Sequence, residues 1–181
     1  MAKICDKDIF LLRIAEIRCC LSVKCYFAAL SLALTLPDIC GKAEYPNEGN
    51  AARYIKWFNR YIGNDEKPKS VYSVYDKNMP YLSGEVVFNL RCSFLHAGNP
   101  GIDKEKIKEE CCRVDRFNVE LGEPFCSREA SVSYGAGMQI CHRECTFNVI
   151  QLCNELCGTA EKYYRKNREK FNFFDYHLTE V

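Results

Sequence analysis

The feature that most constrains the fold is a stripe of large apolar residues at a helical period. Its members are Tyr54, Trp57, Phe58, Tyr61 and Ile62. They recur at i, i+3, i+4, i+7 and i+8, the spacing of side chains along one face of an α-helix. Asn50 before the stripe and Gly63 after it suit the two ends of such a helix. The stripe therefore predicts a helix over residues 50–63 with one buried face.

Apolar periodicity elsewhere predicts a mainly α protein. Predicted helices cover residues 8–20, 22–36, 83–96, 103–112 and 144–170. Pro37 is expected to end the second of them, which leaves residues 36–50 as a loop. Alternation over 117–121 indicates a strand, and residues 129–142 around Gly135 and Gly137 indicate a small hairpin. We expect one domain, residues 1–181, built as a compact helical bundle with a β-hairpin insertion near residues 116–142.

The composition favours a soluble, cytoplasmic protein. Apolar residues make up 48% of the chain, and a net charge of +1 exerts no general attraction on nucleic acid or membrane. The 13 cysteines follow an N-terminus, MAKICDKDIF, without the pattern of an export signal, so we expect free thiols in a reducing compartment. The longest apolar run, Tyr26 to Leu36, is too short to cross a bilayer.

An arginine interrupts the apolar face of the helix predicted over 83–96. Val87, Leu90 and Phe94 share that face, and Arg91 points into it. Because an arginine cannot lose its charge, Arg91 must meet a carboxylate, reach solvent, or line a cleft or subunit seam. His96 follows five residues later, about 140° around an ideal helix. The two side chains would converge only if the helix changes pitch or frays at the AGNPG sequence that follows.

The stretch Arg91-Cys-Ser-Phe-Leu-His96 resembles the Arg-x4-6-His signature of the HEPN superfamily. The resemblance implies a helical bundle that dimerises and cleaves RNA without a metal or other cofactor. It assigns catalysis to Arg91 and His96, and it points to toxin–antitoxin or antiphage systems with RNA and an antitoxin or other protein as partners. Many active members carry a polar residue directly after the arginine, where this chain has Cys92.

Two acidic residues of the predicted loop are candidates to support this pair. Asp38 or Glu44 could orient Arg91 or His96, as carboxylates behind a functional group commonly do. Alternatively, Arg91 forms a structural ion pair with Asp38, Glu44 or Glu85, and His96 is a cation favoured by the helix C-terminus. The chain would then be a non-catalytic module of the same descent that binds RNA, a nucleotide or a protein.

Three further groups of residues have alternative interpretations. Arg53, Lys56 and Arg60 form a basic edge that could contact RNA phosphates or could be a solvated surface. A second basic group near the end of the last predicted helix has the same two interpretations, contact with RNA phosphates or a solvated surface; it comprises Lys162, Arg165, Lys166, Arg168 and Lys170. The spacing of Cys141, Cys145, Cys153 and Cys157, next to His142, favours core packing over a zinc site, so no metal ligand is predicted.

Overall fold

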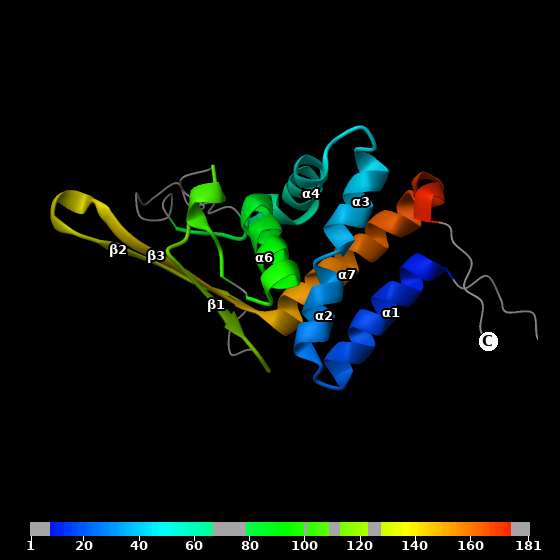
Figure 1. Cartoon of the computed structure of the whole chain (residues 1–181), viewed down its shortest axis with the longest axis horizontal. Coiled ribbons are helices and arrows are strands. Elements are labelled where there is room, and N and C mark those ends of the chain that lie inside the picture. The colour runs from blue at the N-terminus through cyan, green and yellow to red at the C-terminus, as the bar shows by residue number, and fades with distance from the viewer. Residues whose placement is uncertain (1–7, 67–78, 100, 109–112, 123–127, 175–181) are drawn as a thin grey trace, which may run out of the picture.

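Helices dominate the computed structural model of the chain, which describes residues 8–66, 79–99, 101–108, 113–122 and 128–174 (Figure 1). The helices are α1 (Ile9–Ser22), α2 (Tyr26–Ala33), α3 (Leu36–Glu44), α4 (Asn50–Phe58), α5 (Asn64–Glu66), α6 (Gly84–Ala97) and α7 (Val149–Lys166). A π-helical turn, Asn59–Gly63, continues α4, and a 3-10 helix, Arg168–Phe174, follows α7. The predicted mainly α fold with a small β insertion is confirmed.

The predicted loop at residues 36–50 is wrong over most of its length, because α3 occupies Leu36–Glu44. Pro37 lies in the first turn of α3, where its missing N–H has no helical partner to lose. The preceding helix, α2, is shorter than predicted and is separated from α1 by a turn in which Lys24 has a positive φ of 61°. Pro37 therefore begins a helix instead of ending one, and it places Asp38 and Glu44 on a rigid element.

The insertion is a three-stranded sheet whose hairpin projects from the helical body (Figure 1). Its strands are β1 (Arg116–Glu120), β2 (Arg128–Tyr134) and β3 (Ile140–Asn148), in the order β1-β3-β2. β3 pairs antiparallel with β2, as the predicted hairpin requires, and parallel with β1.

Two predicted helices in this region differ from the structure. Residues 144–148 belong to β3, because they pair with β1 and β2 on either side, so the last helix begins at Val149. The Asn148 side chain accepts hydrogen bonds from the N–H groups of Ile150 and Gln151 and caps that helix. The helix predicted over 103–112 is reduced, within the described residues, to a 3-10 turn at Lys104–Lys106; residues 109–112 lie outside them.

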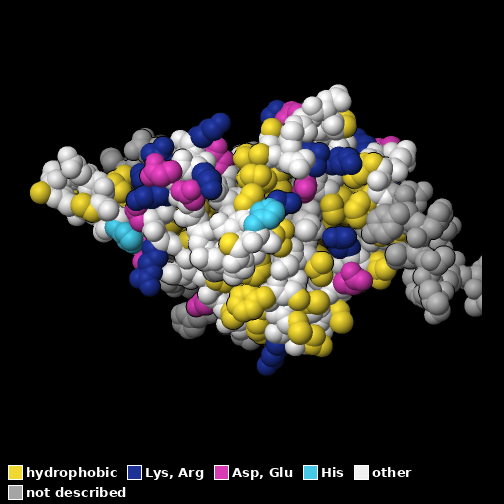
Figure 2. Space-filling view, in the orientation of Figure 1, with side chains coloured by type: hydrophobic (Ala, Val, Ile, Leu, Met, Phe, Trp, Pro, Cys, Tyr) yellow, Lys and Arg dark blue, Asp and Glu magenta, His cyan; other side chains and the backbone are white. Residues whose placement is uncertain are grey.

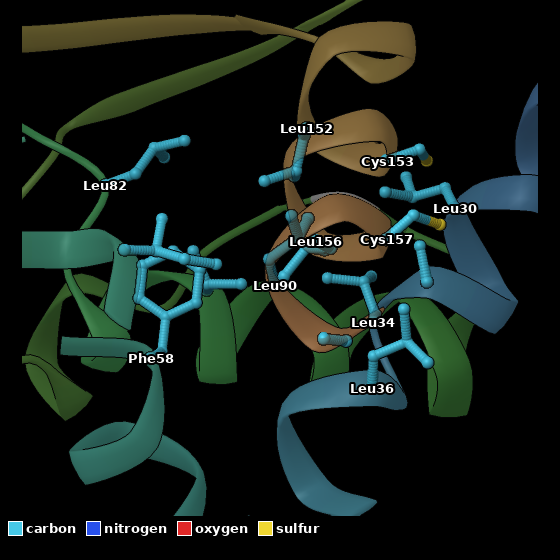
Figure 3. Close-up of a cluster of buried hydrophobic side chains, with 14 of the residues drawn as sticks. Leu30, Leu34, Leu36, Phe58, Leu82, Leu90, Leu152, Cys153, Leu156 and Cys157 are labelled. Atoms are coloured by element: carbon cyan, nitrogen blue, oxygen red, sulfur yellow. The ribbon is translucent and has the colours of Figure 1, made fainter. Parts of the chain in front are cut away.

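The core forms around α7, which packs against α1, α2 and α3. Figure 3 shows Leu152 and Leu156 on one side of α7, with Cys153 and Cys157 directed toward Leu30 of α2. Burial raises the pKa of Cys153 to about 12 and that of Cys157 to about 11. Both thiols therefore stay protonated and pack as small apolar groups. No helix within the described residues is long and apolar enough to span a membrane.

Candidate functional site

Helix α6 carries both predicted catalytic residues, and its ends are where the sequence predicts them. Ser83 accepts a hydrogen bond from the N–H of Val86 and caps the helix, while Glu85 lies in the first turn. Gly98, with φ of 64°, ends the helix in the left-handed conformation that glycine adopts most easily. The α-helix extends through residues 91–97, so the change of pitch that would bring Arg91 and His96 together is absent.

Arg91 lies at the edge of the apolar face, beside a carboxylate from another helix. Its Nη2 atom is 3.9 Å from Oδ2 of Asp38, and 24% of its side chain is exposed. Its Nε atom is buried and has no hydrogen-bond partner among the described residues. Asp38 is bound more firmly by Arg53, whose Nη2 and Nε both donate to Oδ1, at 2.8 and 3.0 Å. We refer to Asp38, Arg53 and Arg91 as the Asp38 cluster.

Two glycines allow the three helices that supply this cluster to approach closely. A Cβ atom on Gly41 of α3 would lie 2.7 Å from the backbone oxygen of Arg53 on α4. A Cβ atom on Gly84 of α6 would lie 2.6 Å from the backbone oxygen of Ile55, also on α4. Larger residues at either position would separate the helices. The close packing of α3 and α6 on α4 thus brings the three charged side chains together.

Tyr54 is part of this environment, although sequence reasoning did not identify it as a site residue. It is fully buried, and its hydroxyl donates a hydrogen bond of 3.2 Å to the backbone oxygen of Leu34. Burial raises the pKa of Tyr54 far above its ordinary value, and the positive charge of Arg91 offsets this only in part. Tyr54 is therefore neutral and acts as an uncharged hydrogen-bond donor. One feature of the sequence indicated this role: Tyr54 belongs to the apolar stripe and directly follows Arg53.

His96 has a different environment from Arg91. It is exposed on the last turn of α6, whereas Arg91 is partly buried. Cys92, between them in sequence, is also partly buried. Figure 2 shows histidine, basic and acidic side chains gathered on the front of the molecule, over α6 and α3. The single chain therefore presents an exposed imidazole and a partly exposed guanidinium on one helix.

Glu44, the second acid predicted to support Arg91 or His96, has other partners. Its carboxylate accepts hydrogen bonds from Tyr163 (2.8 Å), Lys170 (2.7 Å), Arg60 (2.9 Å) and Tyr61 (3.4 Å). Burial alone would raise the pKa of Glu44, but the bonds from Lys170 and Tyr163 and the nearby cations lower it overall. Glu44 thus links α3 to the C-terminal helices, and of the two predicted acids it is Asp38 that meets Arg91.

The three residues predicted to bind RNA are all close to carboxylates. Arg53 pairs with Asp38, Lys56 with Glu48 and Arg60 with Glu44. The side chains of Lys56 and Arg60 are more than half exposed, whereas that of Arg53 is 15% exposed. Arg53 is therefore part of the Asp38 cluster, and the other two lie on the outer surface of the same helix and the turn that follows it.

No His, Cys, Asp or Glu side chains in the described part of the chain gather in a group of three that could hold a metal ion. The chain was compared with known proteins in three ways. No family model, no curated protein and no solved structure matches the chain.

Proposed function

We propose that this chain is a metal-independent endoribonuclease resembling the HEPN superfamily, with Arg91 and His96 at its active site. The observation that carries the proposal is the state of Arg91. Its Nε donor has no hydrogen-bond partner among the described residues, its guanidinium lies 3.9 Å from the nearest Asp38 oxygen, and 24% of its side chain is exposed. An arginine in this state is suited to bind a phosphate oxygen, and the same helix supplies an exposed imidazole.

The chemistry requires no metal, because RNA carries its own nucleophile. The ribose 2′-oxygen attacks the adjacent phosphorus and loses its proton to a base, while the bond from phosphorus to the 5′-oxygen breaks and that oxygen gains a proton. The products are a 2′,3′-cyclic phosphate and a 5′-hydroxyl. His96 serves as base or acid in these proton transfers. Arg91 stabilises the negative charge that develops on the non-bridging oxygens in the transition state.

The reaction uses two proton-transfer groups, and a homodimer would supply two copies of His96. Two exposed apolar side chains support this arrangement, one next to His96 on α6 and one on α2 beside Phe94. Leu95 is 36% exposed, and Phe27 of α2 is 55% exposed. The ring centroids of Phe27 and Phe94 are 5.9 Å apart. Covering apolar side chains of this size lowers the free energy of the complex, whether a second copy or a protein partner such as an antitoxin covers them.

One observation favours a second function, a non-catalytic RNA-, nucleotide- or protein-binding module. Asp38 lies beside Arg91, and within the chain no helix distortion turns His96 toward Arg91. In that case Arg91 would bind an anion without any proton transfer, and His96 would serve as a cation at the helix C-terminus.

Cleavage of a mixed RNA pool in EDTA distinguishes the two functions. The purified protein should cut the RNA, and both Arg91→Ala and His96→Ala should reduce the rate by about a hundredfold or more. Matched controls are Arg116→Ala and His142→Ala, which remove exposed side chains of the same types from β1 and β3. Sedimentation of the same samples gives the oligomeric state. An inactive wild-type protein, or equal activity in all variants, would support the binding module instead.

A further inference from the structure

Asp38 is shared unequally between the two arginines that face it. Arg53 places two donors on Oδ1, at 2.8 and 3.0 Å. Oδ2 faces Nη2 of Arg91 at 3.9 Å, a distance too long for a hydrogen bond. Arg53 and Asp38 therefore form a complete ion pair, whereas Asp38 and Arg91 attract each other without a hydrogen bond between them.

The guanidinium of Arg91 is consequently under-satisfied. Its Nε atom is buried without a partner among the described residues, and leaving a buried donor unpaired costs free energy. The side chain as a whole is 24% exposed, so part of Arg91 lies at the protein surface. Phosphate oxygens match the planar, forked donors of an arginine better than a single distant carboxylate oxygen does.

We propose that Asp38 is an internal counter-ion of Arg91, which a phosphodiester displaces when it binds, while Arg53 retains Asp38. The inference rests on the proposed function, because it takes a phosphodiester as the ligand of Arg91. Asp38 compensates the charge of Arg91 when no anion is bound, and its carboxylate repels an incoming anion. Its carboxylate therefore limits the affinity of the site for phosphate, and it does not act by orienting Arg91 toward the ligand.

The substitution Asp38→Asn tests this directly, because the amide is nearly isosteric and its oxygen can still accept from Arg53. Binding is measured at fixed low salt by fluorescence anisotropy with a labelled 2′-O-methyl oligoribonucleotide, which lacks the free 2′-hydroxyl and is not cleaved. Inorganic phosphate serves as a competitor. We expect D38N to bind about tenfold more tightly than the wild type, the effect of roughly one charge-assisted hydrogen bond.

Two controls separate this effect from a change in net charge. Asp103→Asn removes the same charge from the exposed ion pair with Lys106 and should change the dissociation constant less than about twofold. The gain from D38N should disappear in the Arg91→Gln background, because the released group is absent there. Circular dichroism verifies folding, and Asp38→Ser replaces D38N if the latter does not fold.

The outcomes for the two proposals are distinct. If D38N binds no better than the wild type, if D103N gains as much, or if neither form binds the oligonucleotide, Asp38 is not a counter-ion displaced by phosphate. If D38N gains affinity through Arg91 but no form of the protein cleaves RNA in EDTA, the counter-ion inference stands and the nuclease proposal fails.

Discussion

Replacing Gly84 by alanine tests whether the contact between α4 and α6 depends on a missing side chain. The new Cβ atom would lie 2.6 Å from the backbone oxygen of Ile55 and 2.9 Å from its Cα atom, where ordinary contact begins at 3.4 Å. Neither is the flexible end of a side chain, so the helices must separate by about 0.8 Å. The shift also strains the 2.7 Å hydrogen bond from the Gly84 N–H to Oδ1 of Asn59.

The magnitude follows from these opposing effects. Overpacking of a tight contact costs about 1–3 kcal/mol, and weakening the hydrogen bond adds up to about 1 kcal/mol. The higher helix propensity of alanine offsets at most about 1 kcal/mol of this cost. We therefore expect Gly84→Ala to lower the free energy of unfolding by about 1–3 kcal/mol, measured by urea denaturation as a lower midpoint with an unchanged slope.

The matched control is Gly158→Ala, on α7. Apart from the backbone of its own helix, a Cβ atom at Gly158 meets no atom of the described residues within 4 Å, so the substitution brings only the propensity gain. It should stabilise the protein by about 0.5–1 kcal/mol. If Gly84→Ala were as stable as the wild type, or if both variants shifted the midpoint in the same direction, the argument from close helix packing would be refuted.

Two further predictions concern a partly buried carboxylate, Glu44, and a buried indole N–H, that of Trp57. Because the folded-state pKa of Glu44 is lowered, the stability it contributes is present above its ordinary pKa of 4.5 and is lost as the pH falls through the lower folded-state value. Glu44→Gln should cost about 1–3 kcal/mol at neutral pH and flatten the loss of stability in acid; an unchanged acid profile in urea titrations would contradict this. Trp57→Phe should cost less than about 2 kcal/mol, against the ~3–5 kcal/mol typical of Trp→Ala, because Trp57 Nε1 is buried without a hydrogen-bond partner among the described residues. Thermal or urea unfolding that shows the full loss for the phenylalanine variant would mean that the indole N–H has a partner.

The sequence by itself determined the features that depend on neighbours along the chain. The Ser83 cap, the end of α6 at Gly98 and the apolar stripe containing Trp57 all follow from residues within a turn or two of one another. The strand near Val119 and the hairpin after it were equally predictable, because the alternation of apolar and polar residues along a strand is a local pattern. The presence of Arg91 on an apolar face was visible for the same reason.

The tertiary structure alone determined which residues that are far apart in the sequence come into contact. Pro37 is compatible with the start of a helix as well as with its end, and only the packing of α3 on α4 selects the first. The start of α7 was missed because pairing with β1 and β2 holds residues 144–148 as a strand, against a helical pattern in the sequence. Asp38 and Glu44 looked equivalent as partners of Arg91. Six residues apart on a helix, they point about 120° away from each other, so one carboxylate meets Arg91 and the other meets Tyr163 and Lys170.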